Sequence, residues 1–142
     1  MKYKSSSAQK TQQIASSLAK QFQKRGGVIA LSGELGSGKT TFVQGFAKGL
    51  GIKEKIISPT FVLIRQHKIP NSKRMLYHLD LYRLEDPQEI KNIGLEEIIN
   101  NPENTVLIEW AEKIKNQLSR GAFFVNFESV SENERIIEIN SL

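Results

Sequence analysis

The fold is decided by one stretch, Val28-Ile29-Ala30-Leu31-Ser32-Gly33-Glu34-Leu35-Gly36-Ser37-Gly38-Lys39-Thr40-Thr41-Phe42. An apolar run ends at Ser32, and a glycine-rich loop follows that closes on Gly38-Lys39-Thr40. The spacing matches G-x-x-x-x-G-K-[ST], a loop whose backbone N–H groups surround phosphate oxygens. Because a strand pattern precedes the loop and an amphipathic helix pattern follows it, the context predicts a phosphate-binding loop.

Each residue type in this loop suits phosphate. Glycine lets the backbone turn tightly and approach phosphate oxygens closely. Successive N–H groups form an anion nest, and the helix start adds a positive dipole end. We expect Lys39 to reach the β- and γ-phosphates and the Thr40 hydroxyl to be a Mg²⁺ ligand. The predicted nucleotide contacts are Gly33, Glu34, Leu35, Gly36, Ser37, Gly38, Lys39, Thr40 and Thr41.

The composition is typical of one folded domain spanning residues 1–142. Charged residues make up 25% and hydrophobic residues 39% of the 142 residues, a balance found in globular proteins. The chain has no cysteine, which excludes disulfides and thiolate metal sites. No apolar run reaches membrane-spanning length, and the first residues lack the apolar core of a secretory signal. We therefore expect a cytoplasmic protein with no membrane contact.

The net charge of +5 allows two interpretations. A polyanionic partner such as tRNA is one, and it predicts binding by the isolated chain that weakens steeply with salt. A lysine-rich solvated surface is the other, and it is favoured because the basic residues are dispersed and form no arginine cluster.

The hydrophobic pattern along the chain alternates between helix and strand periods. The predicted elements are a helix over residues 7–24, a strand over 28–31, a helix from 39 to near 51, a hairpin over 61–69 and 75–84, helical turns over 85–100, a strand over 106–110, a helix over 111–118, and a hairpin over 121–130 and 135–139. This order predicts an α/β fold. We expect a three-layer P-loop NTPase-like architecture with a mostly parallel central sheet and an antiparallel hairpin.

Two acids follow apolar strand patterns. Asp80 stands in an alternating strand, where an unpaired carboxylate is costly to bury, so it lies at the surface or beside a cation. Glu109 ends an apolar strand, and ligands of open α/β sheets gather at such carboxyl ends. We predict that Asp80 and Glu109 act with Lys39 in catalysis and with Thr40 in binding Mg²⁺. The alternatives are a solvent-facing polar stripe and a solvent-exposed terminal acid. His78 shares the Asp80 face and is predicted to be structural.

A proline-stiffened segment, Ser58-Pro59-Thr60, comes between the loop helix and the next strand. Such segments in nucleotide switches place a hydroxyl near the γ-phosphate and its metal. Thr60 is therefore predicted to contact the nucleotide. An ordinary loop-to-strand junction explains the same residues equally well.

Four segments in the same order resemble the small bacterial P-loop ATPase family called TsaE, formerly YjeE. They are Gly33-Glu34-Leu35-Gly36-Ser37-Gly38-Lys39-Thr40-Thr41-Phe42, Ser58-Pro59-Thr60-Phe61, Tyr77-His78-Leu79-Asp80-Leu81-Tyr82-Arg83-Leu84 and Ile108-Glu109-Trp110. The resemblance implies a compact α/β fold that binds ATP and Mg²⁺. It also implies a part in making threonylcarbamoyladenosine in tRNA, with TsaB and TsaD proteins as partners and with tRNA involved only indirectly.

Under that interpretation the chain is an ATPase that hydrolyses slowly alone and faster in its complex, because no arginine stands out as a finger supplied in cis. A small P-loop kinase for a metabolite is the alternative; it needs an acceptor pocket and usually an arginine-bearing lid. A GTPase of the common class is disfavoured because D-x-x-G and N-K-x-D are both absent.

Overall fold

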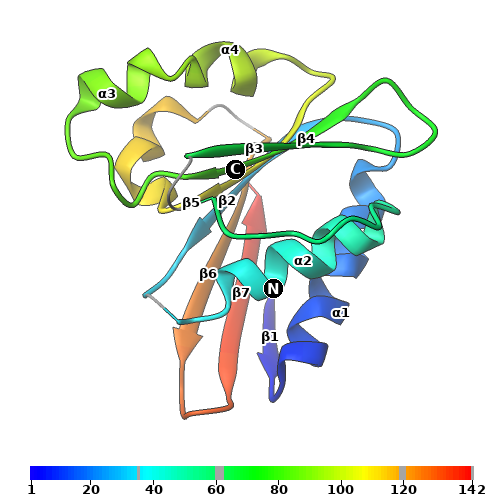
Figure 1. Cartoon of the computed structure of the whole chain (residues 1–142). Coiled ribbons are helices and arrows are strands. Elements are labelled where there is room, and N and C mark those ends of the chain that lie inside the picture. The colour runs from blue at the N-terminus through cyan, green and yellow to red at the C-terminus, as the bar shows by residue number, and fades with distance from the viewer. Residues whose placement is uncertain (35, 60–62, 119–120, 142) are drawn as a thin grey trace.

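The computed structural model describes residues 1–34, 36–59, 63–118 and 121–141 (Figure 1). The elements in chain order are β1 (Lys2–Ser5), α1 (Ala8–Ala19), the 3₁₀ turn η1 (Lys20–Phe22), β2 (Gly27–Ser32), α2 (Lys39–Gly49), β3 (Ile64–Lys68), β4 (Met75–Asp80), α3 (Pro87–Asn92), α4 (Leu95–Asn100), β5 (Thr105–Glu109), the 3₁₀ segment η2 (Ala111–Gln117), β6 (Phe123–Ser129) and β7 (Arg135–Ser141). All the described strands belong to one sheet, in the order β1-β7-β6-β2-β5-β4-β3.

The centre of the sheet is parallel and both of its edges are antiparallel. Strands β6, β2, β5 and β4 pair in parallel, as expected for buried strands fed by helical crossovers. Both predicted hairpins are present, and each extends the sheet outward. The α/β fold class is confirmed, and the parallel part is confined to these four strands.

Helices cover both faces of the sheet (Figure 1). The first apolar cluster lies between the sheet and the pair α1 and α2, where Phe22, Phe42 and Phe46 are fully buried. The second lies between the opposite face and α3, α4 and η2, around Leu79, Leu95 and other apolar side chains. These two clusters give the expected three layers, helix on sheet on helix.

The helix boundaries follow from capping residues. The Ser7 hydroxyl accepts a hydrogen bond from the Lys10 amide and caps α1, as the serine run predicts. The Asp86 carboxylate caps α3 in the same way through Gln88. Gly51 takes a left-handed backbone just after α2, which only glycine adopts without strain.

The parallel strands end together at one edge of the sheet. Leu31 of β2 stands opposite Glu109 of β5, and Glu109 stands opposite Asp80 of β4. Because parallel strands share a direction, the loops that follow these three strands emerge side by side.

Within the described ranges, no helix has the length and hydropathy needed to cross a membrane.

Candidate functional site

The glycine-rich loop lies between β2 and α2 and has the backbone that glycine allows. Gly33, Gly36 and Gly38 have φ values of 149°, 75° and 106°. A Cβ atom built on Gly33 would stand 2.8 Å from the Ser37 hydroxyl oxygen, so the turn has no room for a side chain there. The Ser37 amide donates to the Glu34 carbonyl at 3.1 Å, and the buried Ser37 hydroxyl has no partner among the described residues.

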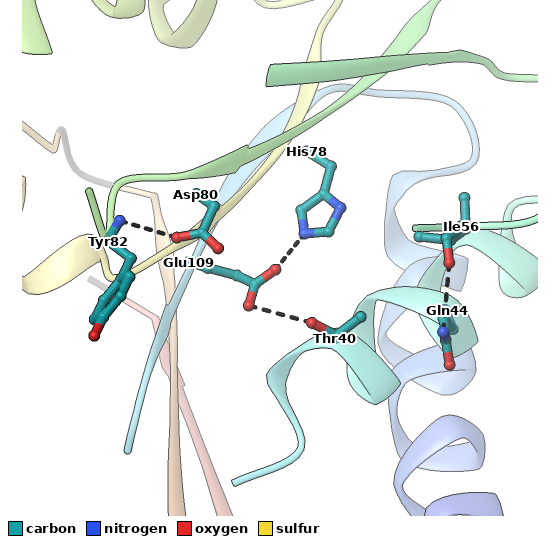
Figure 2. A network of polar contacts seen from close by, with 7 residues as sticks. All are labelled: Thr40, Gln44, Ile56, His78, Asp80, Tyr82 and Glu109. Atoms are coloured by element: carbon teal, nitrogen blue, oxygen red, sulfur yellow. Dashed lines mark hydrogen bonds and ion pairs between the residues drawn. The ribbon is translucent and has the colours of Figure 1, made fainter. Parts of the chain in front are cut away.

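Two carboxylates face this loop from neighbouring strand ends. Asp80 and Glu109 are each only 3% exposed. Asp80 accepts a hydrogen bond of 2.9 Å from the Tyr82 amide through Oδ1, which fixes its side chain at the end of β4 (Figure 2). Both acids act electrostatically on Lys39, so the buried Asp80 has a cation near it.

A chain of polar contacts joins Glu109 to α2 and to β4 (Figure 2). The Thr40 hydroxyl donates to Glu109 Oε1 at 3.5 Å. On the other side, His78 Nε2 lies 2.5 Å from Glu109 Oε2. His78 was predicted to be structural, and its contact with an acid of the site was not foreseen from the sequence. The available signal was its position on the same strand face as Asp80.

Lys39 is held over the loop and against an indole. Its ammonium donates to the Gly33 carbonyl and lies 3.8 Å from the centroid of the Trp110 ring. Trp110 has φ of 61°, a left-handed backbone that costs a bulky residue about 1–3 kcal/mol. This backbone places Trp110 beside Tyr82, with ring centroids 5.0 Å apart. The indole thus offers Lys39 a cation–π contact beside the acids.

Burial and nearby negative charge act on the pKa of Lys39 in opposite directions. Burial lowers the pKa of the Lys39 ammonium from its ordinary value, while the negative charges of Glu109, Glu112 and Asp80 partly counteract that shift. A phosphate group placed on the loop would add negative charge beside Lys39 and stabilise its charged form.

These side chains line one cavity of about 290 Å³, bounded by Gly36, Gly38, Lys39, Thr40, Thr41, Ser58, Asp80, Tyr82, Glu109 and Trp110. A larger cavity of about 540 Å³ lies between α1 and the strands β6 and β7. Its described lining residues include no acid and no residue of the loop, so the smaller cavity is the one that combines phosphate-binding and acidic groups.

A second cavity of about 220 Å³ adjoins the other side of the loop. It shares Gly36, Gly38 and Thr41 with the cavity of about 290 Å³ that contains Asp80 and Glu109, called here the acidic cavity. Its other lining residues are Ser7, Ala8, Thr11, Glu132, Asn133 and Arg135. Arg135 Nη2 donates to the Gly36 carbonyl at 3.3 Å, and Nη1 donates to three carbonyls of the β6–β7 turn. The sequence reasoning missed Arg135 because no motif marks it.

Two predicted nucleotide contacts, Leu35 and Thr60, lie outside the described residues. Ser58, just before Thr60, does line the cavity. Arg74, which lies just before β4 in the β3–β4 hairpin, is buried at the opposite end of the sheet. There it donates to the Phe22 carbonyl and to Thr105 at the start of β5, so Arg74 takes no part in the site.

The donor set suits a hard cation. Thr40, Asp80 and Glu109 offer oxygen ligands, which Mg²⁺ prefers. In the described part of the chain, no group of three or more His, Asp or Glu side chains is arranged to hold a metal ion. A magnesium ion here would therefore need further oxygens from phosphate and water, as is usual for Mg²⁺ in nucleotide sites.

A phosphate-binding loop between β2 and α2, with acids at the ends of two neighbouring parallel strands, defines a P-loop nucleotide-binding protein. The family model "Threonylcarbamoyl adenosine biosynthesis protein TsaE" matches residues 5–137. The chain therefore belongs to the TsaE family.

Individual relatives agree with this assignment. The tRNA threonylcarbamoyladenosine biosynthesis protein TsaE of Bacillus subtilis is 37% identical over 142 residues, covering 100% of this chain and 86% of that protein. The protein of the same name from Rickettsia felis is 42% identical over 132 residues, covering 92% and 74%. A crystal structure of Bacillus subtilis YdiB superposes with a TM-score of 0.78 at 33% identity, covering 99% of this chain and 84% of that one.

Proposed function

We propose that this chain is an ATPase that serves threonylcarbamoyladenosine modification of tRNA as the nucleotide-dependent subunit of a complex with TsaB- and TsaD-like proteins. Family membership supports the pathway. The observation that carries the ATPase is the cavity in which Lys39, Thr40, Asp80 and Glu109 meet beside the loop. The whole chain acts as one nucleotide-binding domain, and tRNA is engaged indirectly through the partners.

The side chains of the cavity divide the work of binding. Lys39 leaves the Gly33 carbonyl and places its charge on the β- and γ-phosphates, while the loop amides hold the phosphate oxygens. Thr40, Glu109 and Asp80 are the residues that would hold Mg²⁺, directly or through water. A magnesium ion bound there neutralises negative charge on the phosphates.

Asp80 or Glu109 orients the water that attacks the γ-phosphorus. The new bond joins the water oxygen to that phosphorus, the bond to the β–γ bridging oxygen breaks, and the water proton leaves to a carboxylate or to solvent. Lys39 and the loop amides stabilise the charge on the departing ADP. Because no described arginine lines the acidic cavity, hydrolysis by the isolated chain is slow and partners accelerate it.

The second cavity suits the nucleoside. It begins at Gly36 and Gly38 and continues on the side of the loop away from Asp80 and Glu109. Its lining offers hydroxyls, an amide and the Arg135 guanidinium, which are groups that bond ribose and base. ATP would then lie with its base beside the β6–β7 turn and its γ-phosphate toward the acids.

The sharpest test separates binding from hydrolysis. Lys39→Ala removes the cation that contacts phosphate, so ATP binding measured by calorimetry is expected to fall below detection. Glu109→Ala leaves the loop intact, so ATP binding is expected to persist while magnesium-dependent hydrolysis drops at least about 100-fold, as for other groups that act in the transition state. Equal loss of binding in both variants contradicts this division of roles.

The partner assignment has its own test. A pull-down from the source cell with ATP and Mg²⁺ is expected to recover TsaB- and TsaD-like proteins, and fewer of them without nucleotide. Adding those partners to the purified chain is expected to raise ATP turnover. Fast ATP turnover by the chain alone argues against the proposal, and so does equal recovery of the partner proteins with and without ATP.

A further inference from the structure

His78 is fully buried, and its polar bonding goes to Glu109. The ring has 0% exposure, and Nε2 stands 2.5 Å from Glu109 Oε2. The other ring nitrogen, Nδ1, is also buried and has no hydrogen-bond partner among the described residues. Among the described residues, the hydrogen-bond partner of this ring is thus an acid of the nucleotide cavity.

The carboxylate of Glu109 is held at both of its oxygens. Oε2 meets His78 and Oε1 meets the Thr40 hydroxyl, which come from β4 and α2 (Figure 2). A carboxylate oxygen accepts, so Nε2 carries the proton and donates it. Without His78, Oε2 would be buried at 3% residue exposure with a lost donor, and the side chain would be free to rotate away from Thr40.

We infer that His78 is a positioning residue for the reaction: by donating from Nε2 to Glu109 Oε2, it holds that carboxylate in the orientation used toward the nucleotide. This inference rests on the proposed function. His78 lines neither cavity beside the loop, so it acts through Glu109 and contacts no substrate atom. Outer partners that orient a ligating or catalytic side chain typically change activity by about 10–100-fold when removed.

The chain supplies a matched control, because it has two histidines. His67, on β3, is 7% exposed, and its Nδ1 also lies 2.5 Å from a glutamate oxygen, that of Glu54. Neither His67 nor Glu54 lines the acidic cavity. Replacing His67 therefore removes a histidine–glutamate contact of the same length away from the site, although Glu54 is exposed where Glu109 is buried.

The first measurement needs no nucleotide. Proton–nitrogen correlation spectra of the histidine rings in the intact chain, assigned with His67→Gln and His78→Gln, are expected to show the His78 proton on Nε2. Glu109→Gln is expected to shift the His78 signals and leave the His67 signals in place. A proton on Nδ1, or His78 signals unmoved by Glu109→Gln, overturns the inference whatever the chain does with ATP.

The second measurement is steady-state ATP hydrolysis with parallel binding. His78→Leu is expected to lower kcat about 10-fold or more, with ATP affinity measured without Mg²⁺ within about twofold of the parent. His78→Gln is expected to restore most of kcat, because the glutamine amide donates from nearly the same place as Nε2. His67→Leu is expected to stay within about twofold.

Two results overturn the positioning role: an unchanged kcat in His78→Leu, or equal losses in His78→Leu, His78→Gln and His67→Leu. Urea midpoints of all variants report folding, and the spectra of the parent chain decide the matter if His78→Leu does not fold. If the parent chain hydrolyses no ATP, either alone or with partners, the proposed function is contradicted. The histidine ring spectra still test the His78–Glu109 hydrogen bond in that case.

Discussion

Lys39 sets the charge balance of the site at the scale of a single residue. Burial lowers the pKa of its ammonium, and three carboxylates partly offset that effect. The ammonium is satisfied by the Gly33 carbonyl and the Trp110 ring, which are weaker partners for a cation than a polyphosphate chain. Phosphate binding is therefore coupled to the protonation of this one amine.

The coupling predicts a pH dependence with a definite sign. Bound phosphate raises the pKa of Lys39 above its lowered value in the free chain, so binding takes up a proton in the alkaline window just below 10.5. Nucleotide affinity is expected to fall as the pH rises through that window. Calorimetry in buffers of different ionisation enthalpy measures the proton uptake directly. Lys10→Ala, an exposed control, is expected to keep the uptake, and a nucleotide affinity of the parent chain that stays constant through that window contradicts the assignment.

The lowered pKa of Lys39 also makes the unfolding free energy depend on pH, with a sign opposite to that of nucleotide affinity. A lysine whose pKa is lowered by folding binds fewer protons in the folded state. The unfolding free energy contributed by Lys39 therefore increases as the pH rises toward 10.5.

Residue type predicted part of the site and missed the rest for a physical reason. Lys39 and Thr40 belong to a contiguous motif, and Asp80 and Glu109 stand out as charges in apolar strands. His78 was assigned a structural role because a histidine in a strand carries no partner information by itself. Arg135 is 99 residues from Gly36 along the chain, and only the fold reveals that contact.

At the scale of elements, strong periodic patterns were predicted correctly and weak ones were not. The predicted helix over 7–24 is α1 followed by the turn η1, because the apolar spacing continues through Phe22 as the helix tightens. Strand β1 was missed: Lys2–Ser5 is short and mostly exposed, so it lacks the alternation that marks a half-buried strand. It forms only through pairing with β7.

The packing of α1 on α2 gives a sharp prediction. A Cβ atom on Gly45 would lie 2.4 Å from the Gln12 Cα and carbonyl oxygen, so Gly45→Ala must push the two helices apart. Overpacking costs about 1–3 kcal/mol, which exceeds the helix-propensity gain of about 1 kcal/mol for alanine over glycine. The urea midpoint is expected to fall. Lys48→Ala, on the exposed side of the same helix, is the control, and a stabilised Gly45→Ala would show that the helices are not in close contact.

At the scale of the whole molecule, the site exists because strands distant in sequence become neighbours. The acids reach the loop only through the order β2-β5-β4, and such long-range pairing has no local sequence signal. The parallel strands at the centre of the sheet were predictable from apolar strands alternating with helices, but the sheet as a whole is mixed, because strands at both of its edges pair antiparallel. The position of each hairpin at an edge was not predictable, since it depends on which strand each one joins.

Nucleotide in the proposed position would touch the loop, the start of α1 and the β6–β7 turn, and so would stabilise the molecule as a whole. ATP at 100 times its dissociation constant is expected to raise the unfolding free energy by about 2.7 kcal/mol. Tripolyphosphate, which has no nucleoside, is expected to stabilise through the loop alone. Thermal unfolding with either ligand measures both effects.

A variant of Arg135 distinguishes ligand contacts in the nucleoside cavity from contacts in the acidic cavity. Because it lines only the cavity assigned to the nucleoside, Arg135→Ala is expected to weaken stabilisation by ATP and to leave stabilisation by tripolyphosphate close to that of the parent. Arg25→Ala, remote from both cavities, controls for the loss of a positive charge. Equal loss for both ligands in Arg135→Ala would mean that the guanidinium acts on the loop through the Gly36 carbonyl. The nucleoside would then have to be placed elsewhere, and the orientation of ATP across the loop would change with it.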